Sequence, residues 1–155
     1  MSKEFERKFL VKDDSYRAMS YKSVRIAQGY LSTDKRATVR VRIFGDESYL
    51  TVKGENRGIV RDEWEYPIPM DDAYQMLHRL VEGVAVDKTR YFVKYGGGTW
   101  EVDEFHSPVS GLVVAEIELE HPEQEFNLPP FIGDEVTGDP RYYNSNIANM
   151  GNQTI

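Results

Sequence analysis

Charged side chains occupy alternate positions in several short segments of the sequence, and their types could bind phosphate groups and divalent metal ions. The first segment is E-F-E-R-K-F-L, where Glu4, Glu6 and Lys8 alternate with Phe5 and other residues up to Phe9. Alternate side chains of a β-strand point to the same face. A strand here would therefore carry these charges on one face and the aromatic side chains on the other.

The same alternation recurs along the chain. The charged positions are Arg40 and Arg42; Lys53; Arg61, Glu63 and Glu65; Lys88 and Arg90; Glu101 and Asp103; and Glu116, Glu118 and Glu120. Taken singly, each segment fits a half-buried sheet whose charged face lies in water. A row of carboxylates repels itself, however, unless a cation lies near it. The whole set therefore favours charged faces that point into a shared interior.

Such an interior would need ligands that neutralise its charges, because buried charges must be paired. Several basic groups facing one cavity suit a polyanion, and arginine can bind phosphate oxygens through two hydrogen bonds at once. Carboxylates suit hard divalent cations such as Mg²⁺ or Mn²⁺. A polyphosphate with one of these metal ions satisfies both demands. The sequence has no P-loop pattern, so phosphate binding would depend on side chains.

Strands dominate the elements that must position these residues. Short turns, including G-D-E at residues 45–47 and G-G-G at residues 96–98, separate about eight strand patterns. Apolar spacing predicts one helix over residues 71–81 with an aspartate cap, and Asp13 or Asp14 could begin another. The pattern indicates an antiparallel sheet or a closed barrel with a few helices.

Composition limits the class of protein. A chain of 155 residues suggests one domain over residues 1–155. The net charge of −7 argues against binding to a nucleic-acid polymer. Without cysteine there are no disulfides or thiolate metal sites. No apolar run is long enough to span a membrane and the N-terminus is polar, so we expect no membrane partner and a cytoplasmic location.

The ordered motifs resemble those of the CYTH superfamily, also called triphosphate tunnel metalloenzymes. E-F-E-R-K resembles the family's N-terminal E-x-E-x-K signature, and the resemblance continues through Q-G-Y, T-V-R-V-R, L-T-V-K-G, R-D-E-W-E, D-K-T-R-Y, W-E-V-D-E-F, G-L-V-V-A-E-I-E-L-E and D-P-R-Y-Y-N-S. The length is similar to that of the short bacterial members. The resemblance implies a mainly β (α+β) fold, in which an eight-stranded antiparallel barrel forms a tunnel with a few helices packed outside.

The resemblance also implies roles for individual residues. Substrate phosphates would be bound by Lys8, Arg40, Arg42, Lys53, Lys88 and Arg90. Mg²⁺ or Mn²⁺ would be bound by Glu4, Glu6, Glu116 and Glu118, with Glu63 and Asp103 as further ligands. Glu4, Glu6, Glu63 and Lys88 would act in catalysis. Glu65, Glu101 and Glu120 are additional acidic candidates, and Arg57 and Arg61 could reach a tunnel mouth.

Members of the family hydrolyse inorganic or organic triphosphates or, as class IV adenylate cyclases, form cyclic AMP. The short chain shows no addition that would bind a nucleotide base, which favours hydrolysis of tripolyphosphate or a nucleoside triphosphate. A cyclase remains the first alternative. A non-catalytic polyphosphate-binding module is the second, although a pure anion binder would avoid so many carboxylates. The resemblance also makes a homodimer plausible.

Overall fold

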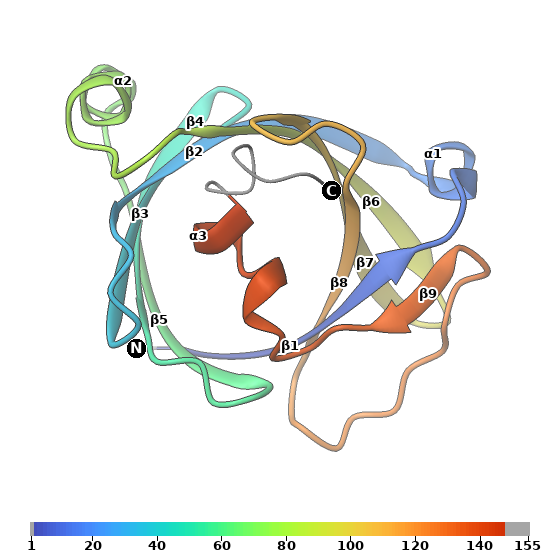
Figure 1. The fold of residues 1–155 in the computed structure, drawn as a ribbon. Helices are drawn as coiled ribbons and strands as arrows, with labels where there is room; N and C mark the ends of the chain where they lie inside the picture. The colour runs from blue at the N-terminus through green and yellow to red at the C-terminus, as the bar shows by residue number, and fades with distance from the viewer. Residues whose placement is uncertain (1, 148–155) are drawn as a thin grey trace.

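A closed antiparallel β-barrel forms the body of the molecule in the computed structural model, which describes residues 2–147. Its strands are β1 (Ser2–Val11), β2 (Lys22–Ser32), β3 (Ala37–Phe44), β4 (Glu47–Gly54), β5 (Val60–Pro67), β6 (Val86–Tyr95), β7 (Gly98–Ser107) and β8 (Val113–Leu119). They follow the order β5-β4-β3-β2-β6-β7-β8-β1, and pairing of β1 with β5 closes the barrel (Figure 1). The predicted eight-stranded barrel is thus confirmed.

Strand β1 is shared between three neighbours. Its first half pairs with β5, its other edge pairs with β8, and its last residues pair with the short strand β9 (Ile132–Glu135). Strand β9 lies beside the barrel and was not predicted. This arrangement brings segments from both ends of the chain to the same side of the barrel (Figure 1).

Two glycine turns set the pairing of the strands that carry charged residues. Gly45 lies in the turn between β3 and β4, and Gly96 and Gly97 form the turn between β6 and β7. All three have positive φ angles, which glycine adopts without steric cost. The second turn fixes the register that places Arg90 opposite Asp103. Both predicted turns are confirmed.

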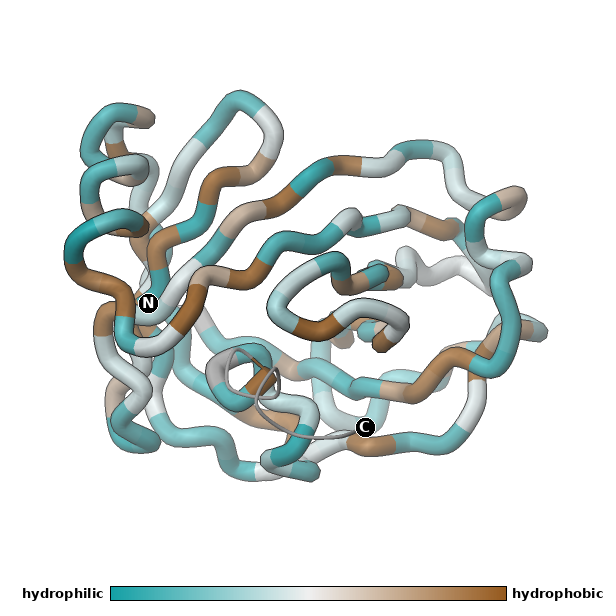
Figure 2. Tube along the Cα trace, turned by 45° about the horizontal axis from the view of Figure 1, so that its top comes forward, coloured by the Kyte–Doolittle hydropathy of each residue, from teal (hydrophilic) through white to brown (hydrophobic). Residues whose placement is uncertain are grey.

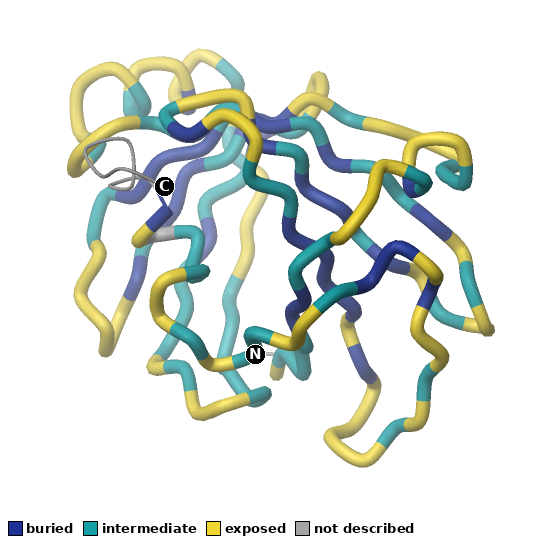
Figure 3. Tube along the Cα trace, turned by 45° about the vertical axis from the view of Figure 1, so that its right-hand side comes forward, coloured by how far each residue is buried: buried dark blue, intermediate teal, exposed yellow. Residues whose placement is uncertain are grey.

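The apolar face of β1 packs on the outside of the barrel, as the alternation predicts. Phe9 is buried there against Trp100, with ring centroids 5.5 Å apart, and Phe126 covers both rings. Helix α1 (Ser15–Met19) adds Tyr16 to the same core. Apolar and polar residues alternate along the strands in Figure 2, and the strand centres are the most buried part of the chain in Figure 3. The inner face is therefore left to polar residues.

Helix α2 (Met70–Arg79) packs outside the barrel, where Ala73 contacts the buried side chains of Val41 and Ile43 on β3. The predicted helix is present, but the prediction of an aspartate cap is wrong. Pro69 occupies the N-cap position in an extended conformation, and both aspartates lie in the first turn, where the helix dipole favours negative charge.

The segment after β9 crosses the barrel opening. It contains the 3₁₀ helix η1 (Pro140–Tyr142) and helix α3 (Asn144–Ile147), which lie within the barrel outline in Figure 1. Ile147 is 1% exposed and packs with Val86, Phe105 and Val114. The outside packing predicted for the helices holds for α1 and α2 but not for this segment. Among the helices of residues 2–147, none has the length and apolar character needed to cross a membrane.

Candidate active site in the charged tunnel

A cavity of about 450 Å³ lies inside the barrel, and most of its lining is charged. Its charged lining residues are Lys3, Glu4, Glu6, Lys8, Arg40, Arg42, Lys53, Arg61, Glu63, Glu65, Arg90, Glu101, Glu116 and Glu118. Cationic and carboxylate side chains are equally numerous in this set. The structure therefore brings most of the sequence-predicted site residues together, with the alternate charged faces turned inward.

Four predicted residues do not line this cavity. Lys88 and Asp103 are 0% and 2% exposed and lie in the wall, in contact with each other. Glu120 is exposed beyond the end of β8. Arg57 has a side chain that is 59% exposed and lies 3.9 Å from Asp62.

Three carboxylates converge at one place on the wall. Glu4 and Glu6 share the inner face of β1, and the register between β1 and β8 places Glu118 opposite Glu6. One carboxylate oxygen from each of these residues lies within 4.8 Å of the others. This is a set of oxygen ligands that suits a hard divalent cation.

Burial and mutual repulsion both favour protonation of Glu6 and Glu118. Burial, with the charges of Glu116 and Glu4, raises the pKa of Glu6 well above its ordinary value. Partial withdrawal from water and the Glu4 carboxylate raise the pKa of Glu118 to about 8. A bound cation would remove the repulsion, so these residues fit a divalent metal ion on chemical grounds.

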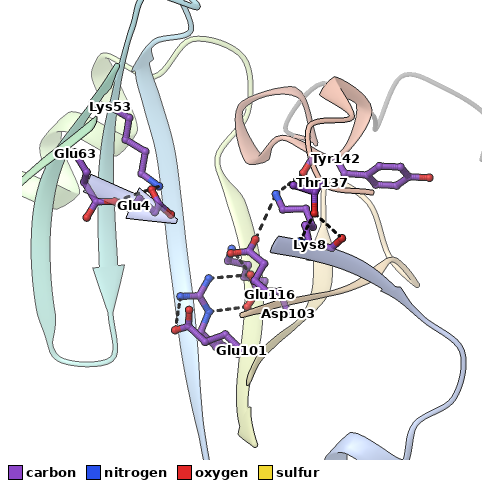
Figure 4. A network of polar contacts seen from close by, with 11 residues as sticks. Glu4, Lys8, Lys53, Glu63, Glu101, Asp103, Glu116, Thr137 and Tyr142 are labelled. Atoms are coloured by element: carbon purple, nitrogen blue, oxygen red, sulfur yellow. Dashed lines mark hydrogen bonds and ion pairs between the residues drawn. The ribbon is translucent and has the colours of Figure 1, made fainter. Parts of the chain in front are cut away.

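Lys53 joins the acidic group to the rest of the tunnel. Its ammonium nitrogen lies 2.9 Å from Glu4 Oε2 and 3.4 Å from Glu63 Oε2 (Figure 4). Burial opposes ionisation of Glu4, but Lys53 holds the pKa of that carboxyl well below its ordinary value. Lys53, predicted to bind phosphate, thus contacts a candidate metal ligand.

Lys8 contacts both strand β8 and the segment that crosses the barrel opening. Its ammonium donates a hydrogen bond of 2.8 Å to the backbone carbonyl of Tyr142 and lies 3.3 Å from Glu116 (Figure 4). Its backbone N–H donates to Thr137 Oγ1. Burial opposes the charge of Glu116, yet Lys8 lowers the pKa of that carboxyl to about 2. The crossing segment after β9 therefore helps to position a tunnel cation.

Arg40 and Arg42 extend from β3 into the same space. Arg40 donates to Thr51 Oγ1 and lies 3.7 Å from Glu65, whereas Arg42 donates from Nε to the Gln28 side-chain oxygen at 2.9 Å. In residues 2–147, no carboxylate forms an ion pair with Arg42. Burial and two neighbouring arginines lower the pKa of Arg42 to about 9. An anion in the tunnel would relieve this unfavourable environment.

Several uncharged lining residues were missed by the sequence-based reasoning. They are Tyr30, Asn56, Gly58, Ile59, Thr137, Gly138, Tyr143 and Asn144. Tyr30 has a usable signal, because it follows Gln28 by two positions in the Q-G-Y motif and so shares its face. The others lie outside the strands, where strand alternation gives no information.

Comparisons with known proteins agree with this geometry. The family model described as CYTH domain matches residues 2–143. A protein of Acetivibrio thermocellus named inorganic triphosphatase is 50% identical over 148 residues, covering 96% of this chain and 94% of the relative. An inorganic triphosphatase of Nitrosomonas europaea is 38% identical over 149 residues, covering 94% and 96%.

A solved crystal structure of an inorganic triphosphatase shows the same arrangement of strands. It superposes with a TM-score of 0.66 at 36% identity, covering 96% of this chain and 95% of the other. The family-model match spans almost every element of the barrel, from β1 to the segment that crosses the opening. The chain with the charged tunnel therefore belongs to the CYTH domain family.

Proposed function

We propose that this protein is a divalent-metal-dependent triphosphatase that hydrolyses a phosphoanhydride bond of inorganic tripolyphosphate inside the tunnel. One observation carries the proposal: the three-carboxylate group and the basic side chains share one cavity of about 450 Å³. The two relatives named inorganic triphosphatase favour hydrolysis over cyclisation. In this proposal, residues 1–155 act as one catalytic unit in the cytoplasm.

The basic residues of the tunnel would bind the three phosphate groups. Arg40, Arg42 and Arg90 come from two strands and can each donate several N–H groups to phosphate oxygens. Lys8 and Lys53 add compact charges beside Glu116 and Glu4. Together they would stabilise the charge that develops on the leaving diphosphate when water attacks the terminal phosphorus and orthophosphate is released.

Glu4, Glu6 and Glu118 would hold Mg²⁺ or Mn²⁺, because their oxygens already lie within 4.8 Å of one another. A bound ion would neutralise phosphate charge and lower the pKa of a coordinated water. Glu116, predicted as a metal ligand with these three residues, contacts Lys8, and Glu63, predicted as a further ligand, contacts Lys53. We therefore assign these two carboxylates the task of orienting the tunnel lysines.

A product assay tests the proposal. Purified protein is incubated with tripolyphosphate, ATP or thiamine triphosphate, each with Mg²⁺ or Mn²⁺, and the products are separated. We expect orthophosphate and diphosphate from tripolyphosphate, and loss of this activity in Glu6→Gln and Lys53→Ala with the fold retained. Glu123→Gln, which changes an exposed carboxylate outside the tunnel, serves as the matched control.

Each other outcome identifies a different function. Conversion of ATP to ADP that is faster than tripolyphosphate hydrolysis would indicate a nucleoside triphosphatase. Cyclic AMP would indicate an adenylate cyclase. Stabilisation by polyphosphate without turnover of any substrate would indicate a binding module. Light scattering on the same samples tests for the homodimer that the family resemblance makes plausible.

A further inference from the structure

We propose that Asp103, which the sequence suggests as a metal ligand, is instead a positioning residue that holds Arg90 in place to bind the triphosphate. This inference depends on the proposed function, since it assigns a task within the same tunnel. It is drawn from the hydrogen bonds of one cluster in the barrel wall, formed by Asp103, Arg90, Lys88 and Glu101. Asp103 and Glu101 are labelled in Figure 4.

Both carboxylate oxygens of Asp103 are already engaged. Oδ1 accepts a hydrogen bond of 2.8 Å from Arg90 Nε. Oδ2 accepts one of 3.0 Å from Arg90 Nη2 and one of 2.7 Å from Lys88 Nζ. The residue is 2% exposed and lies outside the three-carboxylate group. A divalent cation at Asp103 would have to approach two positive side chains, which electrostatic repulsion opposes.

Arg90 gains a fixed orientation from these contacts. Asp103 takes two of its five N–H groups, and Glu101 accepts a third from Nη1 at 3.1 Å. One N–H group on each Nη atom is left for a phosphate oxygen, and Arg90 lines the cavity. Because the guanidinium is held before substrate arrives, binding does not have to restrict its rotation.

The charge balance of the cluster also keeps Arg90 available to bind phosphate. The cluster holds two carboxylates, Asp103 and Glu101, and two cations, Arg90 and Lys88, but only Arg90 and Glu101 line the cavity, since Lys88 is fully buried in the wall. Lys88 offsets the charge of Asp103 within the wall. The carboxylate can therefore orient the guanidinium while the positive charge of the arginine remains available to an anion.

A pair of variants with opposite expected effects tests the inference. Asp103→Asn keeps the side-chain shape and removes the charge that orients Arg90, whereas Glu118→Gln alters the three-carboxylate group. Calorimetry measures binding of tripolyphosphate without metal and, separately, binding of Mn²⁺ without phosphate. For Asp103→Asn we expect tripolyphosphate to bind about ten- to a hundredfold more weakly, the effect of losing a charge-assisted hydrogen bond, and Mn²⁺ to bind within about twofold of wild type. Glu118→Gln should give the reverse pattern.

The opposite result for Asp103→Asn, with weakened Mn²⁺ binding and normal tripolyphosphate binding, would overturn the inference. Should that variant not fold, the double variant Lys88→Met/Asp103→Asn removes one charge of each sign from the wall and is measured in the same way. Lys88→Met alone is the matched control for the lysine. Wild-type protein that neither binds nor hydrolyses tripolyphosphate would contradict the proposed function itself, so the two failures are distinguishable.

Discussion

Replacing Arg42 with methionine should make the ligand-free protein more stable while removing its affinity for tripolyphosphate. The Arg42 guanidinium lies inside the tunnel near Arg40 and Arg90, and its Nε donates a hydrogen bond to the side-chain oxygen of Gln28. An arginine keeps its proton near neutral pH, so the unfavourable environment remains in the native state instead of being relieved by deprotonation. Methionine has a similar length and no charge.

The size of the effect follows from two opposing contributions. A pKa lowered to about 9 corresponds to about 5 kcal/mol of unfavourable interaction with the charged form. Water in the tunnel screens part of it, and Gln28 would lose its hydrogen-bond partner at a cost of about 1–3 kcal/mol. We expect a net stabilisation of about 2 kcal/mol, which for a chain of this size raises Tm by about 6 °C.

Urea unfolding at pH 7 without metal or phosphate, monitored by tryptophan fluorescence, measures the change in the free energy of unfolding. Tripolyphosphate should raise the Tm of wild-type protein and leave that of Arg42→Met almost unchanged, because a ligand stabilises only the state that binds it. Arg7→Met is the matched control: Arg7 pairs with Glu135 outside the tunnel, so this variant should be less stable than wild type. An Arg42→Met protein less stable than wild type, or equally stabilised by tripolyphosphate, would refute the reasoning.

Three further predictions concern the metal ion, pH and the crossing segment. EDTA should abolish phosphate release and added Mn²⁺ should restore it, as an orthophosphate assay will show. Because the pKa of Glu118 is raised from 4.5 to about 8, its contribution to stability is greatest below pH 4.5 and declines as pH rises through 8. Thermal unfolding should therefore show a flatter pH dependence for Glu118→Gln, and Mg²⁺ should stabilise wild type more at pH 8 than at pH 5. Ile147→Ala should lower the free energy of unfolding by about 2–4 kcal/mol, because it leaves a cavity. It should also raise KM, because loosening of the segment releases the Tyr142 carbonyl from Lys8. An unchanged KM would mean that the segment does not position Lys8.

Strand alternation was enough to predict which side chains share a face of each strand, and the concentration of charge on one face of the strands favoured that face as the inner one. Glu4, Glu6 and Lys8 follow that rule, and so do Arg40 and Arg42, because a period of two leaves each side chain only two directions. The closed barrel followed from the resemblance, since alternation alone also fits an open sheet.

Contacts within the tunnel could not be predicted in the same way. The pairing of Asp103 with Arg90 depends on the register set by a glycine turn, so the family resemblance implied a metal ligand at that position instead. The role of Thr137 beside Lys8 depends on where β9 leaves β1, and nothing periodic marks that point. Pro69 replaced the expected aspartate cap because the chain enters α2 from an extended segment.

The use of β1 as the shared strand has a consequence for the order of folding. The backbone N–H of Phe5 donates to the side chain of Glu118, a contact that spans 113 residues of sequence. Strand β1 is synthesised first, but its partner β8 leaves the ribosome only when most of the chain has been made. Barrel closure is therefore a late, non-local event, and folds dominated by such contacts form slowly. Glu4 and Glu6 cannot meet Glu118 before that step, so the nascent chain has no complete three-carboxylate group with which to capture a metal ion.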